Sequence, residues 1–457
     1  MILEHWENTI VTDRCKLTFY RYIKMQKIEL ESPGGLQNYL SLTLIQVSFY
    51  MCISVVMVGF MLAQKYGIKG AVLSIFLGNI ALIFLAIPLS VYTTESRKTT
   101  AMQMHDILGK YGSKIATLGL IISLTGWFSV QMTLLSDTVI KGLALVDISV
   151  SKIPINLMLG AFIITIVSRG ITALRGFAKI MAPLFLVTII LAIVMYVKMD
   201  GGSTASFLSR LPASPLASTG NDMAIIGGII MIMVCPLCGL FDMPTYYRFS
   251  SSKRDSIISI ILLFGIGVPM IELTGVLFYA FMPNADSIIT IMMNNSVGIV
   301  FVAWNVMFIA MSECSINNSN LYVSAVNAEI ITSKIPFKRR TIIIGAIGIA
   351  TSFIDVMEHF ASFLQAISIV ISSLVAVMII NFALKGKISQ RFALISVCCG
   401  TIGGILSFIG VLRIVDDAVC LEVLLITTIT YAICSQASWL YQILLRKKDD
   451  KILCRSE

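Results

Sequence analysis

The sequence predicts an all-α polytopic membrane protein with about 12 transmembrane helices. Of its 457 residues, 57% are hydrophobic and 13% are charged, whereas soluble domains carry about 25% charged residues. Apolar stretches of about 20 residues, each long enough to cross a hydrocarbon core of roughly 30 Å, recur from residue 41 to the end of the chain. Because lipid cannot satisfy backbone polar groups and spanning strands would be about half as long, these stretches are expected to be helices.

Twelve apolar stretches are long enough to be spans. The first six are expected near residues 41–64, 70–93, 113–139, 153–170, 177–198 and 223–241. The other six are expected near residues 256–282, 297–326, 341–354, 358–383, 390–412 and 420–445.

A segment rich in glycine and proline, residues 199–222, separates a group of five spans from the next five. An odd number of spans per unit inverts the second unit relative to the first, and inverted repeats are common in secondary transporters. The expected organisation is a cytoplasmic N-terminal tail (1–40), a first five-helix repeat (41–198), an extracellular or periplasmic linker (199–222), a second five-helix repeat (223–383), helices 11 and 12 (384–445) and a cytoplasmic C-terminal tail (446–457).

The basic residues indicate how the chain is oriented. Clusters such as residues 338–340 and 446–448 recur at every second loop, and Lys and Arg are retained on the cytoplasmic side. We therefore expect both termini in the cytoplasm and a plasma membrane location, or the inner membrane in a bacterium. Although the net charge is +9, the basic clusters are expected to face the membrane surface, so we expect no binding of nucleic acid. We expect a monomer whose partners are the lipid bilayer and a small-molecule solute.

Two carboxylates, Glu272 and Glu313, fall inside predicted spans. An ionised side chain at the bilayer centre costs about 2.5 to 3.5 kcal/mol, so each needs a reason. Glu272 lies about ten residues from the outer end of its span, or roughly 15 Å at helical rise. It is a candidate for ion or proton coupling, and the alternatives are a neutral acid hydrogen-bonded between helices or one that faces a water-filled vestibule.

Glu313 belongs to the polar segment MSECSINNSNLY. Helical spacing places Ser312 and Ser315 on one stripe, and Glu313 and Asn317 on an adjacent one. Such a helix offers oxygens to a cation and amides to a solute. Polar contacts between helices are the alternative, but so many polar groups on one helix favour a site.

The sixth span carries the segment MIMVCPLCGLFDMPTYYRF. Pro236 removes a backbone donor, Gly239 loosens the helix and Pro244 interrupts it again. These residues predict a discontinuous sixth helix, whose half-helix ends aim partial charges at a substrate or ion.

The cysteines do not indicate a disulfide framework, because most of them lie inside apolar segments. Cys235 and Cys238 form a C-x-x-C sequence in the sixth span, but a redox role needs a strand-to-helix context. We expect both to be small residues that line a pocket. Asp242 is expected to end the break and to perform no chemistry.

The third span carries TGWFSVQ, in which Trp127 and Gln131 are four residues apart and share a helix face. An indole plane beside an amide suits a flat, hydrogen-bonding ring. Trp127 lies about 14 residues into its span, roughly 21 Å at helical rise, which argues against an interfacial anchor. On the first span, Gln46 and Ser48 are polar groups that can complete a pocket.

Four segments in order resemble the nucleobase–cation symporter family, which includes cytosine and purine permeases and a bacterial hydantoin transporter. They are FLGN ending at Asn79, GWFSVQ, YYRF ending at Phe249 and NNSNLY ending at Tyr322. The spacing of IGAIGIATSFIDVMEHFASFLQAIS also resembles the ninth and tenth spans of the family. The resemblance covers about residues 40–385.

The resemblance implies a leucine-transporter-type fold with two inverted five-helix repeats, broken helices 1 and 6, and two extra helices. It also implies substrate contacts. Trp127 would stack on a planar heterocycle, Gln131 would hydrogen-bond it, and Asn317 or Asn318 would contact it from the eighth helix.

The family's sodium site lies between helices 1 and 8. The resemblance places it here near the backbone of Ser48 and near Ser312, Ser315 and Ile316, although Ile316 offers no side-chain oxygen. The coupling ion is therefore expected to be sodium at this site or a proton carried by Glu313. No organic cofactor and no metal other than sodium is expected.

The predicted function is a secondary active, cation-coupled symporter that imports a nucleobase or related heterocycle, such as cytosine, a purine, hydantoin or allantoin, by alternating access. An amino-acid or other small polar solute transporter of the same fold is the alternative, followed by a non-transporting membrane receptor. No enzyme is expected, because the three histidines, His5, His105 and His359, are dispersed and no catalytic nucleophile and base occur together.

Overall fold

A computed structural model describes residues 35–145, 147–199, 223–281, 285, 288, 292, 298–354, 360–412 and 419–453. These residues form helices and connecting turns, with a single β-bridge between Gln37 and Ser250. Seven of the helices are long and apolar enough to cross a membrane, or eight if one bent pair is a single span. The chain is thus an all-α polytopic membrane protein, as predicted. Residues 200–222 of the predicted linker and the first 34 residues of the predicted amino-terminal tail lie outside the described residues.

The first two predicted spans form three helical segments. Helix α2 (Tyr39–Tyr50) is followed by α3 (Ile53–Ser96), which contains a non-helical residue at Gly67 (φ 72°, ψ 168°). Residues 53–66 correspond to the second half of the first predicted span, and residues 68–96 correspond to the second span. The positive φ at Gly67 is accessible to glycine because glycine has no Cβ.

The rest of the first half contains three helices. Helix α4 (Thr100–Ala144) has a similar break at Gly109 (φ 72°), and its longer part carries Trp127 and Gln131. Helices α5 (Lys152–Val167) and α6 (Ile171–Met199) follow and correspond to the fourth and fifth predicted spans.

The second half begins with a bent span. Helices α8 (Met223–Val234) and α9 (Leu237–Asp242) are followed by the short α10 (Pro244–Tyr247), and the two sides of the break differ in direction by 41°. The seventh span consists of α11 (Lys253–Leu262), a π-helical turn (Leu263–Gly267) and α12 (Val268–Phe281).

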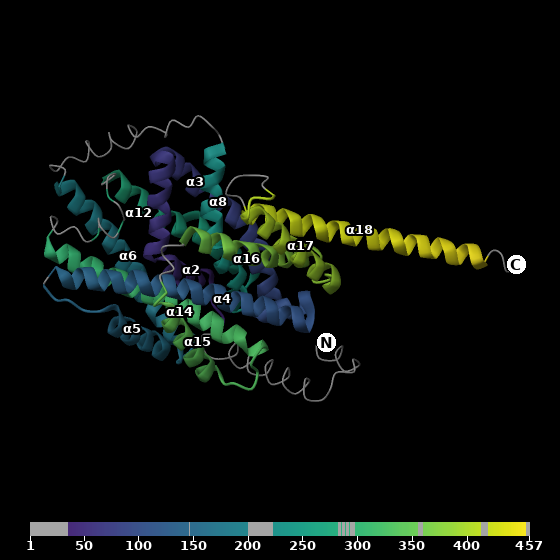
Figure 1. Cartoon of the computed structure of the whole chain (residues 1–457), viewed down its shortest axis with the longest axis horizontal. Helices are drawn as coiled ribbons and strands as arrows, with labels where there is room; N and C mark the ends of the chain where they lie inside the picture. The colour runs from purple at the N-terminus through teal and green to yellow at the C-terminus, as the bar shows by residue number, and fades with distance from the viewer. Residues whose placement is uncertain are drawn as a thin grey trace.

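The remaining spans are mostly uninterrupted helices. They are α14 (Ile299–Asn327) with a 3-10 turn (Ala328–Ile330), α15 (Phe337–Thr351), α16 (Phe360–Ala383), α17 (Gln390–Phe408) and α18 (Val419–Leu453). The far end of α18 extends beyond the rest of the molecule (Figure 1).

Helices from both halves pack against one another at the centre. Helix α14 packs against α2 and α4, and α3 packs along α12. The α3–α12 contact is very close, because a Cβ on Gly59 would overlap the Glu272 carbonyl and one on Gly275 would overlap the Val56 carbonyl. Small residues that allow backbones to touch are typical of helix contacts in membranes.

One end of the bundle is tied together by backbone and charged contacts. Gln37 pairs with the segment after α10, since its N–H donates to the Phe249 carbonyl at 2.7 Å and its carbonyl accepts from the Ser251 N–H at 2.7 Å. Arg97, which follows α3, donates to the carbonyls of Arg248 and Ser250. These contacts join the starts of α2 and α11 to the end of α3, and we call them the terminal clasp.

Candidate functional site

The first span is broken at Met51 and Cys52, between α2 and α3. Two hydrogen bonds from α14 hold the separated ends. The Ile53 N–H donates to Glu313 Oε1 at 2.7 Å, and Ser315 Oγ donates to the Ser48 carbonyl at 3.2 Å. A helix-8 carboxylate therefore caps the N-terminus of one half-helix, while a helix-8 hydroxyl caps the C-terminal end of the other.

The sixth span is broken at Cys235 and Pro236, where the sequence analysis placed a discontinuity. The next residue singled out, Gly239, lies against the first span. A Cβ at Gly239 would overlap the Tyr50 hydroxyl, so the absence of a side chain allows α9 to approach the end of α2.

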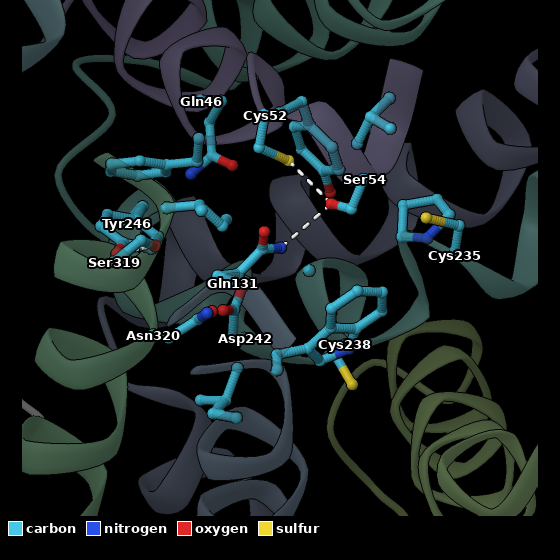
Figure 2. A pocket seen from close by; sticks show the side chains of 18 residues that line it. Gln46, Cys52, Ser54, Gln131, Cys235, Cys238, Asp242, Tyr246, Ser319 and Asn320 are labelled. Atoms are coloured by element: carbon cyan, nitrogen blue, oxygen red, sulfur yellow. Dashed lines mark hydrogen bonds between the residues drawn. The ribbon is translucent and has the colours of Figure 1, made fainter. Parts of the chain in front are cut away.

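The two breaks border a cavity of about 70 Å³ (Figure 2). This is several times the roughly 10–15 Å³ that one water molecule requires. Its walls come from α2, the start of α3, α4, the break in the sixth span and α14. The polar side chains that line it include Gln46, Tyr50, Ser54, Gln131, Asp242, Tyr246, Ser319 and Asn320.

Helix α4 contributes the two residues that the sequence analysis paired. Gln131 Nε2 donates to Ser54 Oγ at 3.0 Å, and the Cys52 sulfur lies 3.1 Å from the same oxygen (Figure 2). Trp127 packs edge-to-face against Phe363, with ring centroids 5.8 Å apart. Both Trp127 and Gln131 line the cavity, so one face of α4 presents an aromatic ring and an amide to it.

Two amides at the cavity have unused hydrogen-bonding atoms. Gln131 Oε1 and Gln46 Nε2 are buried, and neither finds a partner among the described residues. A buried polar atom without a partner costs roughly 1–3 kcal/mol. A solute that offers one donor and one acceptor would remove both penalties.

The eighth helix, α14, presents different residues from those expected. Asn317 and Asn318 do not line the cavity, whereas Ile316, Ser319 and Asn320 do. Asn317 Nδ2 instead donates to the Phe128 carbonyl at 3.4 Å. The polar segment of α14 does border the cavity, but the residues that face it are neighbours of the two asparagines that were expected there.

The other residues expected to couple an ion lie outside the cavity. Ser48 and Ser315 meet at the break of the first span, and Ser312 Oγ donates to the Ile309 carbonyl at 3.0 Å within its own helix. Glu272 accepts a hydrogen bond of 2.6 Å from Asn79 in the seam between α12 and α3. Of Glu272 and Glu313, Glu313 is the one whose carboxylate contacts the break in the first span.

Asp242 is a cavity residue that the sequence analysis set aside. It is the last residue of α9, is 6% exposed and lines the cavity. Its side chain therefore lies at the cavity as well as at the end of α9. Cys238 was expected to line a pocket and lines this cavity. Because residues four apart share a helix face, the position of Asp242 four residues later could have predicted that it lines the cavity too.

Fold and site together define a multi-pass membrane permease with broken first and sixth helices around a central cavity. The model of a protein family described as "Permease for cytosine/purines, uracil, thiamine, allantoin" matches residues 36–397 of this chain. The chain belongs to this permease family, which confirms the resemblance seen in the sequence and the expectation that the protein is not an enzyme. Comparison with curated proteins finds no match.

Solved structures share the leucine-transporter-type fold. Mhp1, a nucleobase-cation-symport-1 family transporter in a closed conformation with bromovinylhydantoin bound, has 14% identity and a TM-score of 0.69, over 89% of this chain and 93% of that one. A Na+-coupled sialic acid symporter in a substrate-bound outward-open state has 13% identity and a TM-score of 0.67, over 91% and 95%. MhsT in complex with L-phenylalanine has 14% identity and a TM-score of 0.55, over 87% and 98%.

Proposed function

We propose that this permease imports a nucleobase or related planar heterocycle by alternating access around the central cavity. The observation that carries the proposal is the set of groups facing the cavity from α2 and α4. Trp127 supplies an aromatic ring, while Gln46 Nε2 and Gln131 Oε1 supply an unused donor and an unused acceptor. A flat ring with polar edges matches both features, because it stacks on the indole and pairs with the amides.

Coupling to an ion is proposed to run through Glu313. Its Oε1 accepts from Ile53 at the break of the first span, while its buried Oε2 finds no partner among the described residues. An unpaired carboxylate in this setting is costly. Either a proton or a sodium ion would neutralise it at the junction of helices 1 and 8, so binding of that ion would favour one arrangement of the broken helix.

Uptake into vesicles tests the transport and coupling proposals together. Radiolabelled nucleobase uptake is measured under an inward proton gradient, an inward sodium gradient and neither. We expect one gradient to drive accumulation, and Glu313→Gln to bind solute but lose the gradient response. The matched variant Glu329→Gln alters a carboxylate that pairs with Arg340 outside the cavity and should keep the response. Uptake that ignores both gradients would refute coupling.

An amino-acid substrate is the nearest alternative, since MhsT shares the fold and was solved with L-phenylalanine. The side chains that line the cavity argue against it here. Among the described residues that line it, none is Lys, Arg or His and Asp242 is a carboxylate, so a substrate carboxylate would meet no cationic side chain. Binding of radiolabelled nucleobases and amino acids to the purified permease distinguishes the two classes.

The orientation is proposed from the basic clusters described above. Both termini and the terminal clasp are placed on the cytoplasmic side of the plasma membrane, or of the inner membrane in a bacterium. Protease accessibility of tags at the two termini, in intact cells and in inverted vesicles, tests this placement. Cleavage of either tag from outside intact cells would contradict it.

A further inference from the structure

We propose that Asp242 selects heterocycles that present two adjacent N–H donors, an amino group beside a ring N–H, as on the N1 and 2-amino edge of guanine. The proposal rests on the proposed function, because it assigns a recognition role within the same cavity. It distinguishes such rings from imides, in which the ring N–H is flanked by carbonyl oxygens and no amino group is adjacent.

The charge balance of the cavity supports this role. Among the described residues that line it, Asp242 is the one carboxylate and none is Lys, Arg or His. No hydrogen bond to its carboxylate occurs within the described parts of the chain, and it takes part in none of their ion pairs. Burial of such a group is costly unless donors surround it. A ligand that brings donors therefore gains more from this site than one that brings acceptors.

The neighbours of Asp242 are other residues of the cavity wall. The carboxylate is close enough to interact electrostatically with Tyr50 and Tyr246, and its side chain projects into the same cavity as those of Gln131 and Asn320 (Figure 2). The Tyr246 hydroxyl is engaged with Ser319 Oγ at 2.7 Å. The Tyr246 hydroxyl is thus already paired, and a ligand can supply donors to the carboxylate.

The geometry of a carboxylate sets the preference. Its two oxygens accept two roughly parallel hydrogen bonds, as in bidentate contacts with guanidinium groups. Adjacent amino and ring N–H groups offer the same spacing. A ring N–H flanked by carbonyls, as in uracil or hydantoin, offers one donor and turns at least one carbonyl oxygen toward the negative charge, which is repulsive.

Guanine and hypoxanthine provide a matched pair of probes, because they differ only by the 2-amino group. Equilibrium binding of each is measured on the full-length purified permease. Loss of a hydrogen bond to a charged group typically weakens binding by about 10- to 100-fold. We expect wild-type permease to prefer guanine by at least about tenfold.

The variant Asp242→Asn removes the charge while keeping the size of the side chain. Its amide accepts one hydrogen bond and donates another, so it suits the N1–H and O6 edge that both purines share. We expect guanine and hypoxanthine to bind this variant equally, and retained hypoxanthine binding shows that the variant is folded. Asp137→Asn is the matched control, since Asp137 lies outside the cavity with its side chain 42% exposed.

The outcomes separate this inference from the proposed function. Equal binding of the two purines by wild type, or a guanine preference that survives in Asp242→Asn, would overturn the role of Asp242 while leaving a heterocycle permease intact. Failure of wild-type permease to bind any purine or pyrimidine would overturn both. A preference abolished only by Asp242→Asn supports the assignment.

Discussion

At the scale of single residues, the cavity depends on side chains whose hydrogen-bonding capacity is only partly used inside the protein. Gln131 illustrates this, because its Nε2 is fixed by Ser54 while its Oε1 faces the cavity without a partner. One half of the amide positions the side chain, and the other half is free for a solute. Gln46 contributes the complementary donor from the opposite side.

The variant Gln131→Leu keeps the approximate volume of the side chain and removes the amide. We expect the affinity for the transported heterocycle to fall about tenfold or more, since the hydrogen bond to the solute is lost and Ser54 no longer accepts one from the Gln131 amide. Equilibrium binding of a radiolabelled nucleobase measures the effect. Gln390→Leu is the control, because Gln390 is exposed and donates to the Asp106 carbonyl away from the cavity. Equal losses in both variants would contradict a direct role for Gln131.

Sequence patterns located the candidate residues better than they oriented them. Trp127, Gln131, Gln46 and the two cysteines of the sixth span were expected at a pocket, and the structure places all five around one cavity. Asn317 and Asn318 were expected there and lie elsewhere. Helical periodicity defines a polar stripe, but the rotation of a helix that is polar on several faces depends on its neighbours. For α14, those neighbours are the two halves of the first span.

At the scale of helices, the close seam between α3 and α12 is a structural element in its own right. Gly59 and Gly275 bring the two backbones into contact, and the Asn79–Glu272 hydrogen bond crosses the same seam. Glu272 can thus have a structural role as a polar link between helices, which was one of the alternatives raised by the sequence. Its place as a coupling residue stays a prediction.

The variant Gly275→Ala tests the seam. Because the new methyl group would overlap the Val56 carbonyl, α3 and α12 must separate, and we expect a destabilisation of about 1–3 kcal/mol. Thermal unfolding of the purified protein in detergent measures it. Gly176→Ala is the control, since a Cβ there meets no atom within 4 Å and should be neutral or slightly stabilising. An unchanged unfolding temperature for Gly275→Ala would contradict the close contact.

At the scale of the whole molecule, the terminal clasp determines whether one end of the bundle can open. Arg97 holds two backbone carbonyls beyond α10, and Gln37 pairs with the same segment in a two-bond bridge. The sixth span therefore cannot move away from the first and second spans without breaking these contacts. In an alternating-access cycle, such contacts stabilise one closed state.

The variant Arg97→Ala should raise the population of a state that is open at the clasp. Loss of two hydrogen bonds of about 1 kcal/mol each favours opening by roughly tenfold or more. Alkylation of Cys238, a buried cavity residue, by a water-soluble maleimide in inverted vesicles measures access. Arg254→Ala, an exposed neighbour on α11, is the control. Equal alkylation rates in wild type and Arg97→Ala would show that the clasp does not limit access.

The overall architecture was largely predictable, because long apolar runs fix the spans and the bilayer allows few alternatives. Predicted and observed helix ends agree within several residues for most of the described spans. The two helix breaks differ in how well the sequence predicts them. Pro236 predicts the break in the sixth span. The break in the first span falls at Tyr50, Met51 and Cys52, and none of these residues disfavours a helix strongly enough to predict it.

The two interruptions consequently have different origins. The kink at Pro236 is caused by proline itself, which lacks a backbone N–H and clashes with the preceding turn, so it would persist in an isolated segment. The gap at Met51 depends on distant partners, above all Glu313, which lies 260 positions after Ile53 along the chain. A synthetic peptide of residues 39–66 in micelles should therefore form one uninterrupted helix, and the gap should arise only when the second half of the protein docks.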